Sequence, residues 1–408
     1  MNHRNRLATL PLLLTAAALL FWIAGCSAPP RGAQGRLDTP EHHTLRGQDA
    51  IDKGDWAEAA RSFDLALSLN REFGPALAGK AIVVAQSANE PGLPPKEREK
   101  RVDQATDLLT DARKKAADDD QKRDAWIAAI RVRRITKSPA NWLSRAEDAY
   151  DDAVKLDKRQ QDPDPHFYMA QAYRDAFEMQ KASDLYRRVL QMNRGRTQQA
   201  DAELAVVQKI LRAEPGSRHG RAVAFEPTLS RADMAALFVE ELQLGRLYSR
   251  NAQGRVDTSF KAPESGQMQA DRIEKMPEAT DIATHPLRSD IDEVMKLKVL
   301  GLEPSADHRF YPDAKTSRAE FALMVEDILV RVTGEQKLKT KFIGQTSPYA
   351  DVRNDAYYFN AVMTVATRKL LEPKQPLQGL FGPTDPVSGA DALLVIRMLK
   401  DELRSYVR

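Results

Sequence analysis

The thiol of Cys26 is the side chain with the clearest chemical potential, because it is the only cysteine among 408 residues. It follows Gly25 at the end of an apolar run over 7–24, and a basic segment precedes that run. A basic start, an apolar stretch and small residues before a cleavage point are typical of a bacterial export signal. A single thiol can carry an acyl chain but forms no internal disulfide, so the fold must be stabilised by packing.

The tetrapeptide Ile23-Ala24-Gly25-Cys26 resembles the lipobox of bacterial lipoproteins. The resemblance implies that a signal peptide of residues 1–25 is removed and that Cys26 then carries acyl chains such as palmitate. An ordinary transmembrane anchor or secretory signal is the alternative, although the apolar run is short for a membrane span. Two or more chains on one residue anchor a protein stably. By the family's sorting rule, the absence of Asp at position 27 favours the outer membrane, facing the periplasm.

A second set of polar side chains recurs in the carboxyl-terminal half, each time behind a Phe-x-Pro segment. The three sets are Ser230-Arg231-Ala232-Asp233, Ser317-Arg318-Ala319-Glu320 and Ser388-Gly389-Ala390-Asp391. A serine followed three residues later by an acid favours a capped helix start. An apolar segment ending at Glu-Pro precedes each set, and proline cannot continue a helix. These landmarks predict three copies of a unit built as helix, Phe-x-Pro, helix.

The order of these landmarks resembles the S-layer homology domain, whose repeats normally occur in threes and form a mostly helical, pseudo-threefold bundle. The resemblance covers roughly 198–404, with copies at about 198–247, 282–332 and 350–404 and a polar linker at 248–281. In that family, grooves between repeats bind cell-wall polysaccharide, and a planar guanidinium suits sugar and carboxylate oxygens. Position by position, the implied glycan-binding residues are Ser230, Arg231, Asp233, Ser317, Arg318 and Glu320. The alternative is that the two arginines pair with acids across the bundle.

Two departures from the family pattern predict that at least one groove is degenerate. The third copy has Gly389 where an arginine is expected. No tryptophan follows Trp142, although the family commonly has one at the start of each first helix. Pro286 lies near that place in copy two, and Ala356 or Tyr357 in copy three.

The stretch between Cys26 and these copies divides into two parts. Residues 26–40 are rich in Pro, Gly and small polar residues, which predicts a flexible tether. From 41 to 197 apolar residues recur at three- and four-residue spacing, which predicts helices throughout. Landmarks within these helices recur at matching offsets. They are Gly47, Ala59, Phe63 and Ala66 in the first copy, and Ala170, Tyr173, Ala182, Tyr186 and Val189 in a later one.

This second pattern resembles the tetratricopeptide repeat, in which small residues let two antiparallel helices approach and an aromatic side chain fills the gap between hairpins. A generic helical bundle is the alternative. Both arrangements give stacked helix pairs, whose concave surface usually binds a protein or peptide. The expected fold is therefore all-α: a tetratricopeptide-like helical-hairpin solenoid over 41–197, followed by a pseudo-threefold S-layer homology bundle.

No residue pattern points to catalysis, so we expect no catalytic residues, no metal and no cofactor. The chain has no nucleophile elbow, phosphate-binding glycine loop or zinc-type histidine pair. His42 and His43 lie at a helix start without further residues at ligand spacing. The formal net charge is +3, from 61 basic and 58 acidic residues, which argues against a nucleic-acid partner.

The sequence thus favours a non-enzymatic, lipid-anchored envelope protein with three partners. These are the membrane through Cys26, a cell-wall polysaccharide or peptidoglycan at 198–404, and an unidentified protein on the helical repeats. The principal alternative is an assembly factor for an envelope or export complex, whose S-layer-like domain binds protein and has no glycan affinity. A third possibility is an accessory subunit of a wall-modifying enzyme. Substitution of Arg231 and Arg318 abolishes wall binding under the first hypothesis, whereas the second predicts no glycan binding to lose.

Overall fold

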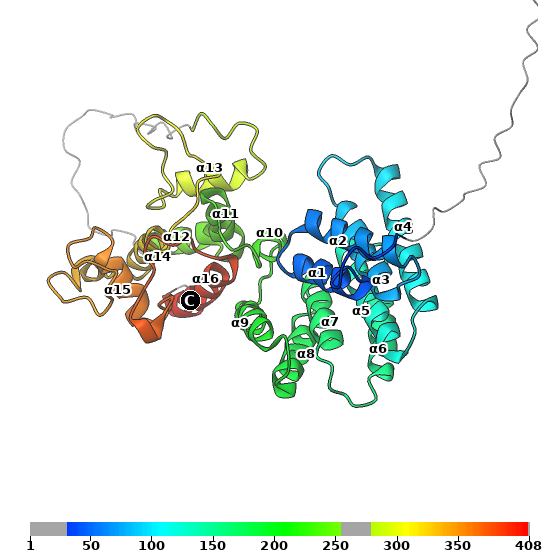
Figure 1. Cartoon of the computed structure of the whole chain (residues 1–408). Coiled ribbons are helices and arrows are strands. Elements are labelled where there is room, and N and C mark those ends of the chain that lie inside the picture. Colours follow the sequence, from blue (N-terminus) through cyan, green and yellow to red (C-terminus); the bar gives the residue numbers. More distant parts are fainter. Residues whose placement is uncertain (1–30, 254–278, 407–408) are drawn as a thin grey trace, which may run out of the picture.

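The computed structural model describes residues 31–253 and 279–406, so Cys26, the predicted signal peptide and most of the predicted linker lie outside the described residues. Figure 1 shows one group of helices, α1 to α8, beside a second group that contains α10 to α16, with α9 between them. The first group and α9 comprise α1 (Pro40–Asp52), α2 (Trp56–Leu69), α3 (Gly74–Ser87), α4 (Pro95–Lys114), α5 (Asp119–Thr136), α6 (Trp142–Leu156), α7 (Asp164–Asp175), α8 (Met179–Met192) and α9 (Thr197–Ala213).

The second group alternates longer helices with single turns. It comprises α10 (Arg218–Val223), α11 (Arg231–Ala236), the π-helical η1 (Leu237–Glu241), α12 (Leu244–Gln253), α13 (Arg288–Lys296), α14 (Arg318–Thr333), α15 (Phe359–Thr367), α16 (Gly389–Leu403) and the 3₁₀ turns η2 (Gln336–Thr340), η3 (Pro376–Gln378) and η4 (Arg404–Tyr406). The described residues contain no strand, which confirms the all-α prediction. Within the same residues, no helix combines the length and apolar character that a membrane span requires.

The first eight helices form four consecutive hairpins, each with its two helices packed together. The first helices of the hairpins (α1, α3, α5 and α7) also pack in sequence order, so they form an inner layer. Local sequence fixes the hairpin turns, as the Gly54-Asp55 pair illustrates. Gly54 has a φ of +74°, and the Asp55 carboxylate caps α2 by accepting a hydrogen bond from the Glu58 backbone N–H.

Phe63 shows how two hairpins approach each other. Its side chain is fully buried between two glycines, Gly47 of α1 and Gly79 of α3. A Cβ atom would lie 2.7 Å from the ring at Gly47 and 2.2 Å from it at Gly79. The ring therefore occupies the volume of both missing side chains, and the glycines set the spacing of the first two hairpins.

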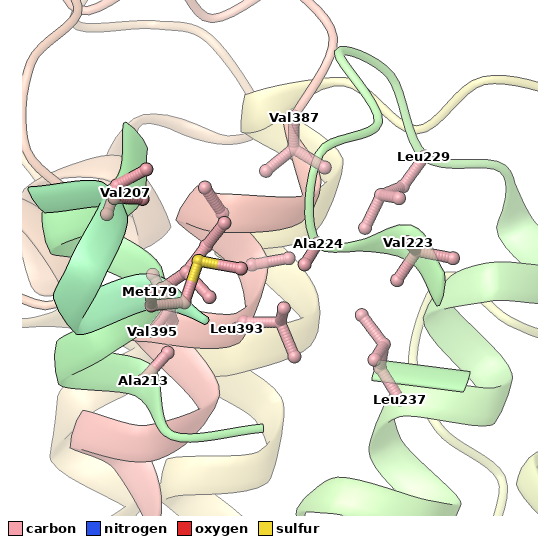
Figure 2. Close-up of a cluster of buried hydrophobic side chains, with 14 of the residues drawn as sticks. Met179, Val207, Ala213, Val223, Ala224, Leu229, Leu237, Val387, Leu393 and Val395 are labelled. Carbon is pink, nitrogen blue, oxygen red and sulfur yellow. The ribbon is translucent and has the colours of Figure 1, made fainter. Parts of the chain in front are cut away.

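Helix α9 packs on α8 and on α16, so it completes the hairpin array and also belongs to the second group. Figure 2 shows apolar side chains from both groups converging here, among them Met179 of α8, Val207 of α9 and Leu393 of α16. An ion pair between Lys209 and Asp391, with an N–O distance of 2.5 Å, spans the same contact. One continuous apolar core therefore joins the two groups.

The segments that precede the three capped helices of the second group meet in a ring of main-chain hydrogen bonds. The Leu229 N–H donates to Val387 O (3.0 Å), that of Thr316 to Leu229 O (2.9 Å), and that of Val387 to Thr316 O (3.1 Å). All three residues are buried. Because each segment donates to one neighbour and accepts from the other, the chain closes on itself through parts far apart in sequence.

The first helices of copies two and three end earlier than their Glu-Pro pairs, which corrects our expectation for residues 303–304 and 372–373. Helix α13 ends at Lys296 and α15 at Thr367. Lys298 and Lys369 then adopt left-handed conformations, and the N–H groups of Val299 and Leu370 bond back to carbonyls five residues earlier. This is the Schellman arrangement, so a left-handed residue ends each helix before proline is reached.

Two further segments differ from the expected boundaries. Residues 31–39 lie in the predicted tether, yet the Arg31 N–H bonds to Ser68 O and the Arg31 side chain bonds to Asp38. Asp38 in turn holds His43, which is buried near the start of α1. In the predicted linker, α12 extends to Gln253.

We predict that Gly79→Ala lowers the free energy of unfolding by about 1–3 kcal/mol, because overpacking against a fully buried ring outweighs the gain of about 1 kcal/mol that alanine gives within a helix. Urea unfolding measures the effect. Gly35→Ala is the control, since no atom lies within 4 Å of its added Cβ. Combining Gly79→Ala with Phe63→Leu should cost less than the sum of the two single changes. Unchanged or increased stability of Gly79→Ala contradicts the packing described here.

Candidate functional site

The two predicted motif arginines lie at equivalent positions and bind backbone carbonyl groups. Arg231 donates from Nε to Phe310 O (2.9 Å) and from its terminal nitrogens to Gly301 O (2.5 Å) and Glu303 O (3.0 Å). Arg318 donates from Nε to Phe381 O (3.1 Å) and from a terminal nitrogen to Glu372 O. Each guanidinium also lies over a phenylalanine ring, with its carbon about 5 Å from the centroid.

These contacts give both arginines a structural task. Each one crosses from the start of a capped helix to the loop of the next copy, where it holds carbonyls that follow the Schellman turn. Arg318 is 4 % exposed, and among the described residues the one carboxylate within ion-pair distance is that of Asp391, at 3.8 Å. Acid pairing across the bundle, the alternative expected from the sequence, is therefore a minor contact for Arg318, whose main partners are backbone carbonyls. The role of Arg231 and Arg318 in glycan binding stays a prediction.

The other four predicted site residues form helix caps. Ser230 with Asp233, and Ser317 with Glu320, make complete capping boxes: the serine oxygen accepts from the third residue's N–H, and the acid accepts from the serine N–H. Ser388 caps α16 in the same way by accepting from the Asp391 N–H. The capped starts expected from the sequence are thus confirmed. Their polar atoms are already engaged within the fold.

Sequence reasoning missed two aspartates that hold the Phe-x-Pro loops. The Asp281 carboxylate accepts from the N–H groups of Phe310 and Tyr311, both at 2.8 Å. Asp351 accepts from Phe381 (2.9 Å) and Gly382 (2.7 Å) in the same manner. Partial burial acts to raise the pKa of Asp281, but the backbone donors outweigh it and hold the pKa below its usual value.

A signal for these aspartates was present in the sequence. Each precedes a buried aliphatic residue, Ile282 or Val352, and lies about 30 residues before its Phe-x-Pro loop. The first copy has no such contact among the described residues.

The structure also explains the absence of an arginine from the third copy. A Cβ atom at Gly389 would lie 1.7 Å from the carbonyl oxygen of Val223, at the end of α10. The Gly389 N–H donates to Glu226 O (2.8 Å), so the first copy's loop closes directly against this helix start. Backbone therefore fills the place that Arg231 and Arg318 occupy at the other two junctions.

A groove of about 630 Å³ runs along the inner layer of the hairpin array. Apolar and small side chains form part of its wall, including Ile51, Ile82, Ala128 and Gly79. Charged side chains are interspersed with them. They are Arg46, Asp49, Asp52, Asp124, Arg131, Asp164 and Arg196, and the imidazole of His42 lies among them. The mixture of small, apolar and charged groups suits an extended polypeptide, because main chain can approach closely while charges fix its register.

Arg196 joins the first and last hairpins at one end of this groove. It bonds to Asp164 at the start of α7 (3.1 Å) and to Asp52 at the end of α1 (3.0 Å). Its guanidinium also lies over the rings of Phe167 and Tyr168. Although burial opposes its charge, the surrounding acids and Tyr168 raise the pKa of Arg196. The array is therefore curled enough for α1 to meet the start of α9.

Asp124 on α5 is the most perturbed acid of the groove. The side chain reaches solvent, but the concave surface surrounds it, and this partial desolvation raises its pKa to about 6. Arg123 opposes the shift, while Asp162 and Asp164 add to it. A carboxyl group whose pKa is raised toward neutral pH, in a concave site, is a feature of binding surfaces. Across residues 31–253 and 279–406, no group of three or more His, Cys, Asp or Glu residues is placed to hold a metal ion.

We predict that Gly389→Arg, which introduces the arginine of the other copies, destabilises the fold by more than about 3 kcal/mol, because the Val223 carbonyl leaves no room for a Cβ. Thermal unfolding measures the change. Gly389→Ala tests the same clash with the smallest side chain, and Gly216→Ala is the control, since its nearest atom is 4.0 Å away. A Gly389→Arg protein as stable as the parent rules out the described closure.

We predict that the Asp124 carboxyl makes the protein less stable as the pH rises from about 4 to 6. Its folded pKa of about 6 exceeds the usual 3.8, so the folded state binds the proton more tightly and loses that advantage on deprotonation. Asp124→Asn removes the effect. Between pH 4.5 and 7, the free energy of unfolding measured with urea should fall less, or rise more, in Asp124→Asn than in the parent. An identical pH difference in Asp124→Asn excludes the shift.

One protein-family model matches part of this chain. The family model of the S-layer homology domain matches residues 348–393, which contain Asp351, the third Phe-x-Pro loop and the start of α16. No curated protein matches the chain. The matched segment is thus similar to an S-layer homology domain, and this similarity indicates association with the cell envelope.

Proposed function

We propose that this chain is a non-enzymatic, lipid-anchored envelope protein, attached to the outer membrane through Cys26, that holds a protein partner and binds the cell wall. The observation that carries the proposal is the match at 348–393, together with the equivalent contacts of Arg231 and Arg318. Those contacts support treating 198–404 as three S-layer homology repeats in a pseudo-threefold bundle. Wall-polymer binding is the common activity of such domains.

The hairpin array supports the second half of the proposal. Phe63 packs between Gly47 and Gly79, as expected of a tetratricopeptide-like array in which an aromatic fills the gap between hairpins. The groove along its inner layer is the natural site for a polypeptide segment of the partner. Because α9 belongs to both parts, a partner in the groove would be held at a fixed position relative to the bundle.

One observation favours the second candidate, an assembly factor whose bundle binds protein and has no glycan affinity. The donors of Arg231 and Arg318 are directed at carbonyls of the chain itself, and backbone occupies the third equivalent place at Gly389. A glycan at these junctions would have to displace those contacts, which costs the hydrogen bonds already made.

Co-sedimentation with purified peptidoglycan sacculi separates the two candidates. The protein used begins at residue 27, so that no acyl chain contributes, and the sacculi are prepared with and without their attached polymers. We expect the parent to pellet with polymer-bearing sacculi and the Arg231→Ala, Arg318→Ala double variant to lose most of this binding. Arg353→Ala is the matched control, because Arg353 is exposed in the same bundle and, within the part of the chain that the structure describes, forms its ion pair with the nearby Asp355.

Since both motif arginines brace the fold, circular dichroism and thermal unfolding must accompany the assay. A folded double variant that no longer pellets supports wall binding at these junctions. A parent protein that fails to pellet with polymer-bearing sacculi overturns the wall-binding proposal and leaves the assembly factor.

A further inference from the structure

The first described residues are fastened to the first hairpin. The Arg31 N–H donates to Ser68 O (2.7 Å), near the carboxyl end of α2. The Arg31 guanidinium makes two parallel bonds to the Asp38 carboxylate (2.8 and 2.7 Å), and His43 of α1 contacts the same carboxylate at 2.8 Å. The guanidinium and the imidazole hold the pKa of Asp38 well below its usual value. The chain therefore has a defined exit point at Arg31.

Chain length limits how far this exit point can lie from a membrane anchor. Four residues, 27–30, separate Cys26 from Arg31. A fully extended chain spans at most about 3.5 Å per residue, so the five steps reach about 17 Å. If Cys26 carries the acyl chains, Arg31 lies within that distance of the lipid headgroups, and the end of α2 lies next to Arg31. The first hairpin then lies beside the bilayer, in contrast to the distance expected from a tether over 26–40.

The surface around this exit point has the composition of a membrane-contacting face. Leu37 and Leu65 are 69 % and 40 % exposed, and both line one shallow hollow beside Arg31. Arg36 lines the same hollow and is exposed, and Arg71 is exposed just after the end of α2. Exposed leucines next to arginines suit the boundary between acyl chains and anionic headgroups.

We propose that this face, formed by Leu37, Leu65 and Arg36, with Arg71 just beyond the end of α2, rests on the phospholipid surface when the chain is anchored. The inference depends on the lipid attachment proposed for Cys26, because the anchor brings the face to the bilayer. The contact adds a second attachment to the acyl chains and fixes the orientation of the first hairpin. Since α1 lines the inner groove, the groove then has a set orientation toward the membrane.

Depth-dependent fluorescence quenching tests the contact in the full anchored chain. The acylated Cys26 leaves no free thiol, so Leu37→Cys, Leu65→Cys and Leu377→Cys variants each take a single fluorophore. Leu377 is the matched control, as it is fully exposed in the bundle. In vesicles of phosphatidylethanolamine and phosphatidylglycerol with doxyl-labelled lipid, we expect labels at 37 and 65 to be quenched at least about twofold more than the label at 377.

The arginines are tested by adding Arg36→Glu and Arg71→Glu to the labelled Leu37→Cys chain, which should reduce its quenching to that of the label at 377. Equal quenching at 37, 65 and 377 in protein that floats with the vesicles overturns the membrane-contact inference and leaves the anchor intact.

Failure of the anchor is recognised separately, because Cys26 then keeps a thiol that takes a second fluorophore. In that case a hexahistidine tag is placed directly before residue 26, which carries a Cys26→Ser substitution. Nickel-chelating lipid in the vesicles binds the tag and so attaches the chain at the same point. The quenching comparison is repeated there with the same expected and opposing results.

Discussion

The ring of main-chain hydrogen bonds among Leu229, Thr316 and Val387 is the constraint on which the second half of the structure depends. Each bond joins two segments separated by at least 70 positions, so each requires two copies and the closed ring requires all three. The capped helices start immediately after the ring, and the two arginines brace its junctions from outside. Closure, caps and arginine contacts are therefore parts of one cooperative arrangement.

Helix α9 extends that arrangement into the hairpin array. It packs on α16 as α13 packs on α11 and as α15 packs on α14, so it takes the position of a first helix in copy one. It also packs on α8 and covers the end of the array. In repeat proteins this end is otherwise covered by a terminal repeat with a polar outer face. Sharing one helix leaves no linker between the groove and the bundle, and the apolar core runs through both.

The sequence predicted those features that depend on local chemistry. Ser230 and Ser317 cap helices, as expected, because each serine and its acidic partner lie three positions apart and the pattern recurs. Prediction was poorer where distant backbone decides. The motif gave no sign that Arg231 and Arg318 would bind carbonyls of another copy, since carbonyls are present at every residue and leave no pattern. The predicted ends of α13 and α15 were wrong because a lysine, unlike a glycine, does not indicate a left-handed conformation, which Lys298 and Lys369 nevertheless adopt.

The arginine of such a motif can recur for the fold alone. At two junctions a guanidinium spans the gap between a helix start and the next loop, and at the third the gap is closed by Val223 and needs no side chain. The absence of an arginine at Gly389 thus follows from the local geometry of copy one. There α10, and a segment from Phe225 to Ser230 that is two residues shorter than its equivalents, bring the backbone close to Gly389. The absence of a motif residue can therefore reflect local packing and does not by itself indicate that a ligand is no longer bound. Ligand binding has to be tested by experiment and not read from the motif.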